Sequence, residues 1–246
     1  MVPIQSAVPC RYPPFVTWAI IGVNVIVFLV QSSLPPQVLE IFLYHYALVP
    51  ARYMHPDWAD WVGLPPDDYL PFFTNMYLHG GWLHLLLNMW SLYIFGPAIE
   101  DRLGKVRFLV FYSLCGVAAS VAHALFNMDS AVPALGASGA IAGVMGAYMR
   151  LFPLANVIVV IPILFFPFFT EVPAAVFAAI WFLLQLVQGV GEMMTPSMGG
   201  GVAWWAHIGG FLVGAVVVKF IRRSNLGYRR YYRDEGVLGF RPSGRR

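Results

Sequence analysis

Residues 136–148 of the chain read GASGAIAGVMGAY. The stretch has small residues at nearly every position and one hydroxyl side chain, Ser138, between an alanine and a glycine. Small residues allow a membrane helix to approach its neighbours closely, whereas a polar side chain within a membrane is costly and usually faces a water-filled cavity. The stretch therefore predicts a tightly packed membrane helix that begins at a serine.

The composition of the whole chain supports a membrane setting. Of its 246 residues, 59% are hydrophobic and 11% are charged, and the mean hydropathy is +0.68. A soluble globular domain has about 25% charged residues. The sequence therefore predicts an all-α polytopic membrane protein with one membrane domain, and it excludes an ordinary soluble enzyme.

Six apolar runs approach the roughly 20 residues that a membrane helix needs. They lie at about 15–31, 76–96, 107–126, 137–152, 172–190 and 203–221. We predict a six-helix membrane domain over residues 15–221, a cytoplasmic arm at 1–14 and a basic cytoplasmic tail at 222–246.

The distribution of positive charge sets the predicted orientation. With six spans and the N-terminus inside, 14 of the 15 lysines and arginines are cytoplasmic and only Arg52 is outside. Residues 153–170 are also apolar, but a seventh span there would place the tail cations outside, against the positive-inside bias. We therefore predict that 153–170 is a connection at the inner interface or partly inserted.

The two ends of the domain predict contacts with the membrane surface. The loop 32–75, rich in aromatic residues and prolines, suits an element on the outer headgroup layer. The basic tail permits nucleic-acid binding in principle, but a juxtamembrane basic segment more commonly meets anionic lipid. We expect lipid and no nucleic acid.

Four polar side chains fall at a similar depth in three of the predicted spans. His84 and Asn88 share one face of the second span, Ser138 opens the fourth, and His207 lies one turn into the sixth. Each residue taken alone has a structural interpretation, such as a serine that bonds to its own helix. Their convergence near the outer surface indicates a site.

The residue types indicate acyl transfer by a nucleophile and a base. Ser138 would be the nucleophile and His207 the general base, with backbone N–H groups near the start of the helix facing a developing oxyanion. His84 and Asn88 would add side-chain donors. Because no Asp or Glu lies at this depth in another span, we expect a dyad without a carboxylate, and we expect no metal or cofactor.

Glycines accompany both reacting residues. Gly136 and Gly139 flank Ser138, and Gly210 and Gly214 follow His207 at helical spacing. These glycines predict close helix contact, which would bring the serine and the histidine within hydrogen-bond reach.

These residues resemble the rhomboid family of intramembrane serine proteases over roughly residues 15–221. The Gly-x-Ser-Gly motif appears at 136–139, the histidine helix at 206–214, and the His-x-x-x-x-His-x-x-x-Asn pattern at His79, His84 and Asn88. The resemblance implies a Ser138–His207 dyad and an oxyanion hole of His84, Asn88 and the Ser138 backbone N–H. It also implies a lateral substrate gate at the second-helix entry loop and the fifth helix.

Two positions differ from the pattern of many members. Leu70 and Pro71 stand where a Trp-Arg pair is common, and Ala142 stands where an aromatic residue stacks on the histidine. We expect Trp204 or Trp205 to contact His207 instead.

The sequence thus predicts an endopeptidase that cleaves single-span or polytopic membrane-protein substrates in a bacterial inner membrane. A non-catalytic membrane-protein binder of the same fold is the first alternative, although such proteins usually lack the serine or the histidine. A histidine-lined transporter is the second, and it predicts broken spans in matched halves or an acidic partner, neither of which is visible.

Overall fold

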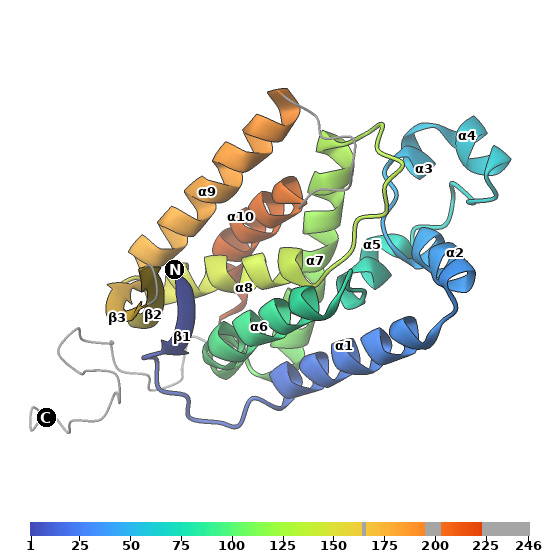
Figure 1. The fold of residues 1–246 in the computed structure, drawn as a ribbon. Helices are drawn as coiled ribbons and strands as arrows, with labels where there is room; N and C mark the ends of the chain where they lie inside the picture. The colour runs from blue at the N-terminus through green and yellow to red at the C-terminus, as the bar shows by residue number, and fades with distance from the viewer. Residues whose placement is uncertain (164–165, 195–202, 223–246) are drawn as a thin grey trace, which may run out of the picture.

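The chain forms a bundle of long helices with a small sheet at one end (Figure 1). This computed structural model describes residues 1–163, 166–194 and 203–222. Most of the predicted basic tail therefore lies outside the described residues.

A long helix lies over each of the six predicted spans. They are α1 (Phe15–Ser33), α6 (Trp82–Leu103), α7 (Lys105–Phe126), α8 (Ser138–Leu151), α9 (Ala174–Met194) and α10 (Trp204–Ile221). Five of them are long and apolar enough to cross a membrane among the described residues, which confirms a polytopic helical membrane protein. The exception, α8, has 14 residues and is about 21 Å long at 1.5 Å per residue.

Helix α8 is the centre of the bundle. Every residue from Gly139 to Tyr148 is buried, and α6, α7, α9 and α10 all pack against it (Figure 1). A helix that is enclosed on all sides needs small residues wherever its neighbours come close. The Gly/Ala composition of 136–148 therefore makes α8 the helix that others surround, and it places Ser138 at one end of that core.

Helix α1 begins without a side-chain cap of its own, because Pro14 precedes it. Glu100 near the end of α6 takes that role from another helix. Its carboxylate accepts hydrogen bonds of 2.9 and 2.8 Å from the backbone N–H groups of Val16 and Thr17, and one of 2.8 Å from the Thr17 hydroxyl. These are charge-assisted bonds at a helix N-terminus, which is where a carboxylate is most favourable.

The predicted surface loop between the first two spans folds into short helices. They are α2 (Pro36–Tyr46), α3 (Ala51–Met54), α4 (Pro56–Trp61), α5 (Pro71–Thr74) and the 3-10 turn η1 (Asn75–Tyr77). Residues 78–81 then connect to α6, so that the second helix begins six residues later than predicted and His79 lies before it.

A buried arginine holds this loop where the Trp-Arg pair is missing. Arg52 is fully buried, and its guanidinium donates to the Pro65 carbonyl at 2.7 Å and to Asp68 at 2.9 Å. Burial raises the pKa of the neighbouring Tyr53 to about 12, so its hydroxyl stays protonated and donates to the Asp68 carbonyl at 3.0 Å. Arg52, from α3, thus anchors the loop immediately before Leu70.

A three-stranded sheet, which was not predicted from the sequence, lies beside the helices. The strands are β1 (Val2–Ser6), β2 (Asn156–Ile163) and β3 (Phe166–Pro173), antiparallel in the order β1-β2-β3. The predicted N-terminal arm and the predicted connection 153–170 therefore pair with each other. The run is rich in β-branched and aromatic residues and is divided by prolines, which favours a hairpin over a helix.

Candidate active site

Ser138 is placed by the loop that enters α8. Gly136 has a φ of +129°, a backbone conformation that side-chain-bearing residues rarely adopt, and its N–H donates to the Asn75 carbonyl at 2.9 Å. Two residues later Ser138 is the first residue of α8 and remains half-buried. The tight turn therefore leaves the hydroxyl at the open end of a buried helix.

His207 lies in the first turn of α10 and bridges two other helices. Its Nε2 is 2.7 Å from Ser138 Oγ on α8, and its Nδ1 is 2.6 Å from Gln185 Oε1 on α9. An amide oxygen only accepts hydrogen bonds, so Nδ1 carries the proton and Nε2 presents its lone pair to the serine hydroxyl. This is the tautomer of imidazole that can remove a proton from Ser138.

Gln185 is the residue that the sequence analysis missed. It is buried, and it holds the position beside the histidine at which a carboxylate stands in a Ser-His-Asp triad. The prediction of a dyad depended only on the absence of Asp and Glu at this depth. An amide within the otherwise apolar run FLLQLV was the available signal, because a polar side chain inside a membrane helix generally has a partner.

Two tryptophans flank the histidine, whereas Ala142 supplies no ring. The Trp181 ring lies 5.8 Å from the His207 ring at 36°, and the Trp204 ring lies 6.2 Å away in an edge-on arrangement. The expected contact from Trp204 is therefore present, whereas Trp205 stacks on Phe126 instead. Trp181 was not predicted, and it stands one helical turn before Gln185 on α9.

The glycines bring the backbones of α8 and α10 into direct contact. A Cβ at Gly210 would overlap the Gly139 carbonyl, and a Cβ at Gly214 would overlap the Gly143 carbonyl. No flexible side chain stands between the two helices at these points. The spacing between α8 and α10 is thus fixed by backbone atoms, and the 2.7 Å separation of Ser138 and His207 follows from it.

His84 and Asn88 lie on the other side of the serine loop. A Cβ at Gly136 would come within 2.8 Å of His84 Nε2 and 3.7 Å of Asn88 Nδ2. The Gly80 N–H approaches His84 Nδ1 at 3.4 Å, which leaves Nε2 as the protonated nitrogen of a neutral ring. Asn88 Nδ2 is buried and has no partner among the described residues. Two N–H donors therefore converge beside the loop that carries Ser138.

A small cavity of about 20 Å³ adjoins the serine. It is large enough for one water molecule. Its polar lining comes from four side chains, namely Asn75, Ser120, His123 and Ser138. His123 thus lines the same cavity as the proposed nucleophile.

The described residues give no sign of a metal centre. No group of three or more His, Cys, Asp or Glu side chains in that part of the chain is arranged to hold an ion. His79 is fully buried, and its two ring nitrogens find no partner within the described structure. Its ring packs edge-on against Phe28 and His84, so it supports the His84 ring from behind.

Three relatives share parts of this sequence. RHOMBOID-like protein 1 of Arabidopsis thaliana is 32% identical over 157 residues, covering 63% of this chain and 36% of that protein. Rhomboid protein 1, mitochondrial, of Saccharomyces cerevisiae is 26% identical over 217 residues, covering 87% of this chain and 55% of that protein. Rhomboid protease GluP of Bacillus subtilis is 41% identical over 76 residues, covering 31% of this chain and 14% of that protein. Each alignment spans less than two thirds of the relative.

The family is established by a match to a family model. The model described as Rhomboid domain covers residues 66–224, which is well over half of the chain. The matched range contains Ser138, His207 and Gln185 together with both donors beside Gly136. The chain therefore belongs to the rhomboid family.

Proposed function

We propose that this chain is an intramembrane serine endopeptidase, with Ser138 as nucleophile and His207 as general base. The observation that carries the proposal is the relay Ser138 Oγ–His207 Nε2 at 2.7 Å and His207 Nδ1–Gln185 Oε1 at 2.6 Å. A base within hydrogen-bond reach of its nucleophile, itself oriented by a third group, is the geometry of acyl transfer. The presence of the protease GluP among its relatives is consistent with this activity.

The proposed reaction begins when Ser138 Oγ attacks the scissile carbonyl carbon and its proton passes to His207 Nε2. Gln185 is a positioning residue: it holds the imidazole in the reactive tautomer and accepts from Nδ1–H throughout. The tetrahedral oxyanion would receive hydrogen bonds from His84 Nε2–H, Asn88 Nδ2–H and the Ser138 backbone N–H. Oxyanion donors of this kind contribute about 3–4 kcal/mol each in other acyl-transfer enzymes.

The imidazolium of His207 then donates its proton to the leaving amine, and the C–N bond breaks to leave an acyl-enzyme on Ser138. Water then attacks the ester carbonyl carbon while His207 Nε2 takes one of its protons. His207 returns that proton to Ser138 Oγ as the acyl C–O bond breaks, which releases the new carboxyl terminus and regenerates the serine hydroxyl. The cavity lined by Ser120 and His123 supplies room for that water beside the nucleophile. The cycle needs no metal or cofactor.

The substrates we propose are single-span or polytopic membrane proteins. A peptide bond inside a helix is shielded by its own backbone, so the substrate segment must unwind where it meets Ser138. We propose a bacterial inner membrane as the location of the protein. We place both termini in the cytoplasm, because this orientation puts most of the lysines and arginines inside. The dyad would then face the outer, aqueous side.

Cleavage of a fluorescent single-span substrate in proteoliposomes tests the proposal. We expect wild type to cleave, and Ser138→Ala and His207→Ala to fall to background with an unchanged unfolding temperature and no effect of chelator. Matched controls are Ser91→Ala, a serine that donates to its own helix at Leu87, and His45→Ala on exposed α2. Cleavage that persists in Ser138→Ala would rule out the serine mechanism.

If the chosen substrate is not cleaved, a labelling experiment distinguishes a protease of narrow specificity from a non-catalytic binding protein. A fluorophosphonate labels only an activated serine, so Ser138 would be labelled in wild type and unlabelled in His207→Ala. Failure to label wild type would favour the binding protein.

A further inference from the structure

The sheet has a strong gradient of polarity along its strands. The rungs near one end carry Ser6, Asn156, Thr170 and Glu171, and the Asn156 amide donates to Glu171 at 2.6 Å. Beyond the rung Val159–Thr170, every residue of β2 and β3 is apolar up to the last pair, Ile163 and Phe166. We call the polar end of the sheet, around Asn156 and Glu171, its foot. We call the apolar end, residues 160–163 and 166–169, its tip.

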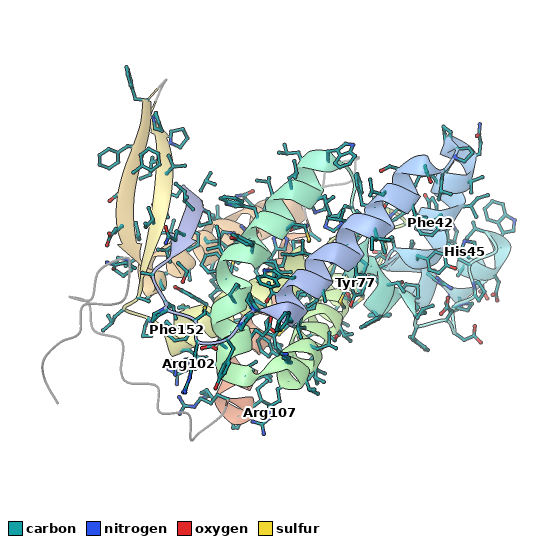
Figure 2. All side chains as sticks on the ribbon, turned by 90° about the horizontal axis from the view of Figure 1, so that it is seen from below. Phe42, His45, Tyr77, Arg102, Arg107 and Phe152 are labelled. Atoms are coloured by element: carbon teal, nitrogen blue, oxygen red, sulfur yellow. The ribbon has the colours of Figure 1, made fainter. Side chains whose placement is uncertain are left out.

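The foot is packed against the bundle, whereas the tip is not. Val157 and Val159 are fully buried, but Phe166, Phe168 and Phe169 are 78%, 54% and 61% exposed. Figure 2 shows the hairpin projecting from the side of the bundle, away from the helices at its far end. Three phenyl rings on one strand in water would be a large exposed apolar patch.

Contacts with α6 give the depth of the sheet in the bundle. At the foot, the Arg102 guanidinium lies over the Phe152 ring at 4.9 Å, and both residues are labelled there in Figure 2. At the other end of β1, the Trp90 indole N–H donates to the Pro3 carbonyl at 2.7 Å. Trp90 precedes Arg102 by twelve residues, about 18 Å along the helix. The sheet thus rises alongside the membrane helix toward its middle.

The contact with Trp90 also shows which face of α6 lies next to the sheet. Leu83, Leu86 and Tyr93 share the exposed apolar surface of that helix with Trp90, at 42–70% exposure. In a polytopic membrane protein an exposed apolar helix surface faces lipid. The sheet continues the surface that α6 presents to hydrocarbon, and the apolar tip lies beyond Val2 and Val160, away from the polar foot.

We infer that the tip of the β2–β3 hairpin is immersed in lipid, where it forms part of the membrane-facing surface beside α6. The occupant of the surface around the exposed phenylalanines of the tip is therefore lipid acyl chains. A free sheet edge is unfavourable in hydrocarbon because its backbone N–H groups lack partners. Pro167 on the free strand β3 has no N–H to leave unpaired.

Depth-dependent quenching tests the inference without reference to enzymatic activity. Single cysteines replace Phe168 at the tip or Glu171 at the foot in a Cys10→Ser, Cys115→Ala background, and each carries a small environment-sensitive fluorophore. In proteoliposomes we expect phosphatidylcholine with a nitroxide on the acyl chain to quench the Phe168→Cys probe several-fold more than the Glu171→Cys probe. Aqueous iodide should quench them in the opposite order.

A second measurement does without the fluorophore and uses a polyethylene-glycol maleimide, which does not enter the hydrocarbon. The liposomes carry pores so that the reagent reaches the protein from both aqueous sides. Phe168→Cys should react only after detergent is added, whereas Glu171→Cys should react before. Equal iodide quenching of the two probes, or equal maleimide reaction before detergent, would place the tip in water and overturn the inference. Crosslinking of Phe168→Cys between copies at high lipid dilution would overturn it by showing that a second copy covers the face.

Discussion

Helices α8 and α9 both contact α10, but they do so in different ways. Along α8, glycines place the two backbones against each other, so neither helix has room to move toward the other. Along α9, the contacts are side chains such as Trp181 and Gln185, while Leu183, Leu184 and Val187 on the same helix are more than half exposed. Ser138 and His207, the proposed nucleophile and base, therefore lie on the pair of helices in backbone contact, and Gln185, which is proposed to orient the base, lies on the helix held only by side chains.

This contrast gives the proposed gate a physical basis. A helix with side-chain contacts and a large exposed surface opens at lower free energy than one enclosed by backbone contacts. Displacement of α9 would also withdraw Gln185 from His207. Substrate entry and orientation of the base would then be coupled through one hydrogen bond.

The largest effect should come from disrupting the backbone contact between α8 and α10, which should lower the stability of the bundle. Gly214→Val places a branched side chain against the Gly143 backbone, which cannot rotate away, and we expect a loss of about 3 kcal/mol or more of stability. Thermal unfolding in detergent measures it. Gly22→Val on α1 is the matched control, since nothing lies within 4 Å of a Cβ there. Equal unfolding temperatures for the two variants would contradict the proposed backbone contact.

The next effect should come from linking α9 to α10 by a disulfide bond. A Cβ at Gly189 on α9 would lie 3.2 Å from Trp204 Cβ on α10, close to the separation that a disulfide needs. In a background lacking Cys10 and Cys115, the oxidised Gly189→Cys, Trp204→Cys pair should lose cleavage of a membrane substrate. It should keep labelling of Ser138 by a small fluorophosphonate.

Reduction of the same protein is the control for the two substitutions, and it should restore cleavage. If the oxidised protein cleaves the membrane substrate as fast as the reduced one, the outer end of α9 need not move.

Removing the orienting amide should lower the rate without unfolding the bundle. We expect Gln185→Leu to reduce kcat on the order of tenfold or more with little change in KM, because the imidazole loses its fixed tautomer. Gln185→Glu keeps an acceptor oxygen beside Nδ1 and should retain more activity. Equal kcat values for the two variants would mean that Gln185 only fills space.

The smallest effect should come from the ring beside the base. Trp181→Leu removes one flat wall of the His207 pocket, and we expect a few-fold lower kcat. Trp181→Phe should behave like wild type because it keeps an aromatic face against the imidazole. A loss in Trp181→Leu as large as that in Gln185→Leu would indicate that packing from α9, rather than the hydrogen bond, holds the histidine.

The helices and the proximity of Ser138 and His207 were accessible from the sequence for a simple reason. Apolar runs of membrane length are unambiguous, and a serine or a histidine inside such a run stands out. The contact between α8 and α10 was equally readable, since Gly210 and Gly214 have the spacing of a close helix pair. The assignment of catalytic roles to Ser138 and His207 remains a prediction that the variants above test.

The sheet and the orienting amide were not accessible in the same way. Hydropathy does not distinguish a buried strand from a short membrane helix, and β1 lies about 150 residues from its partner strand. Gln185 was overlooked because an amide carries no charge, although its burial needs a partner as much as a carboxylate does. The role of Arg52 depends on a fold-back of the outer loop that no local pattern reveals.

The carboxylate of Glu100 has a consequence for how the bundle adapts to its bilayer. Because it caps α1 from α6, the two helices cannot slide along each other without leaving three donors unpaired, two of them on the buried Thr17. In a thicker or thinner membrane, the pair must therefore tilt as one body rather than shift in register. Bilayer thickness would then change the inclination of the whole α1–α6 unit, and with it the height of His84 and Asn88 relative to the headgroups.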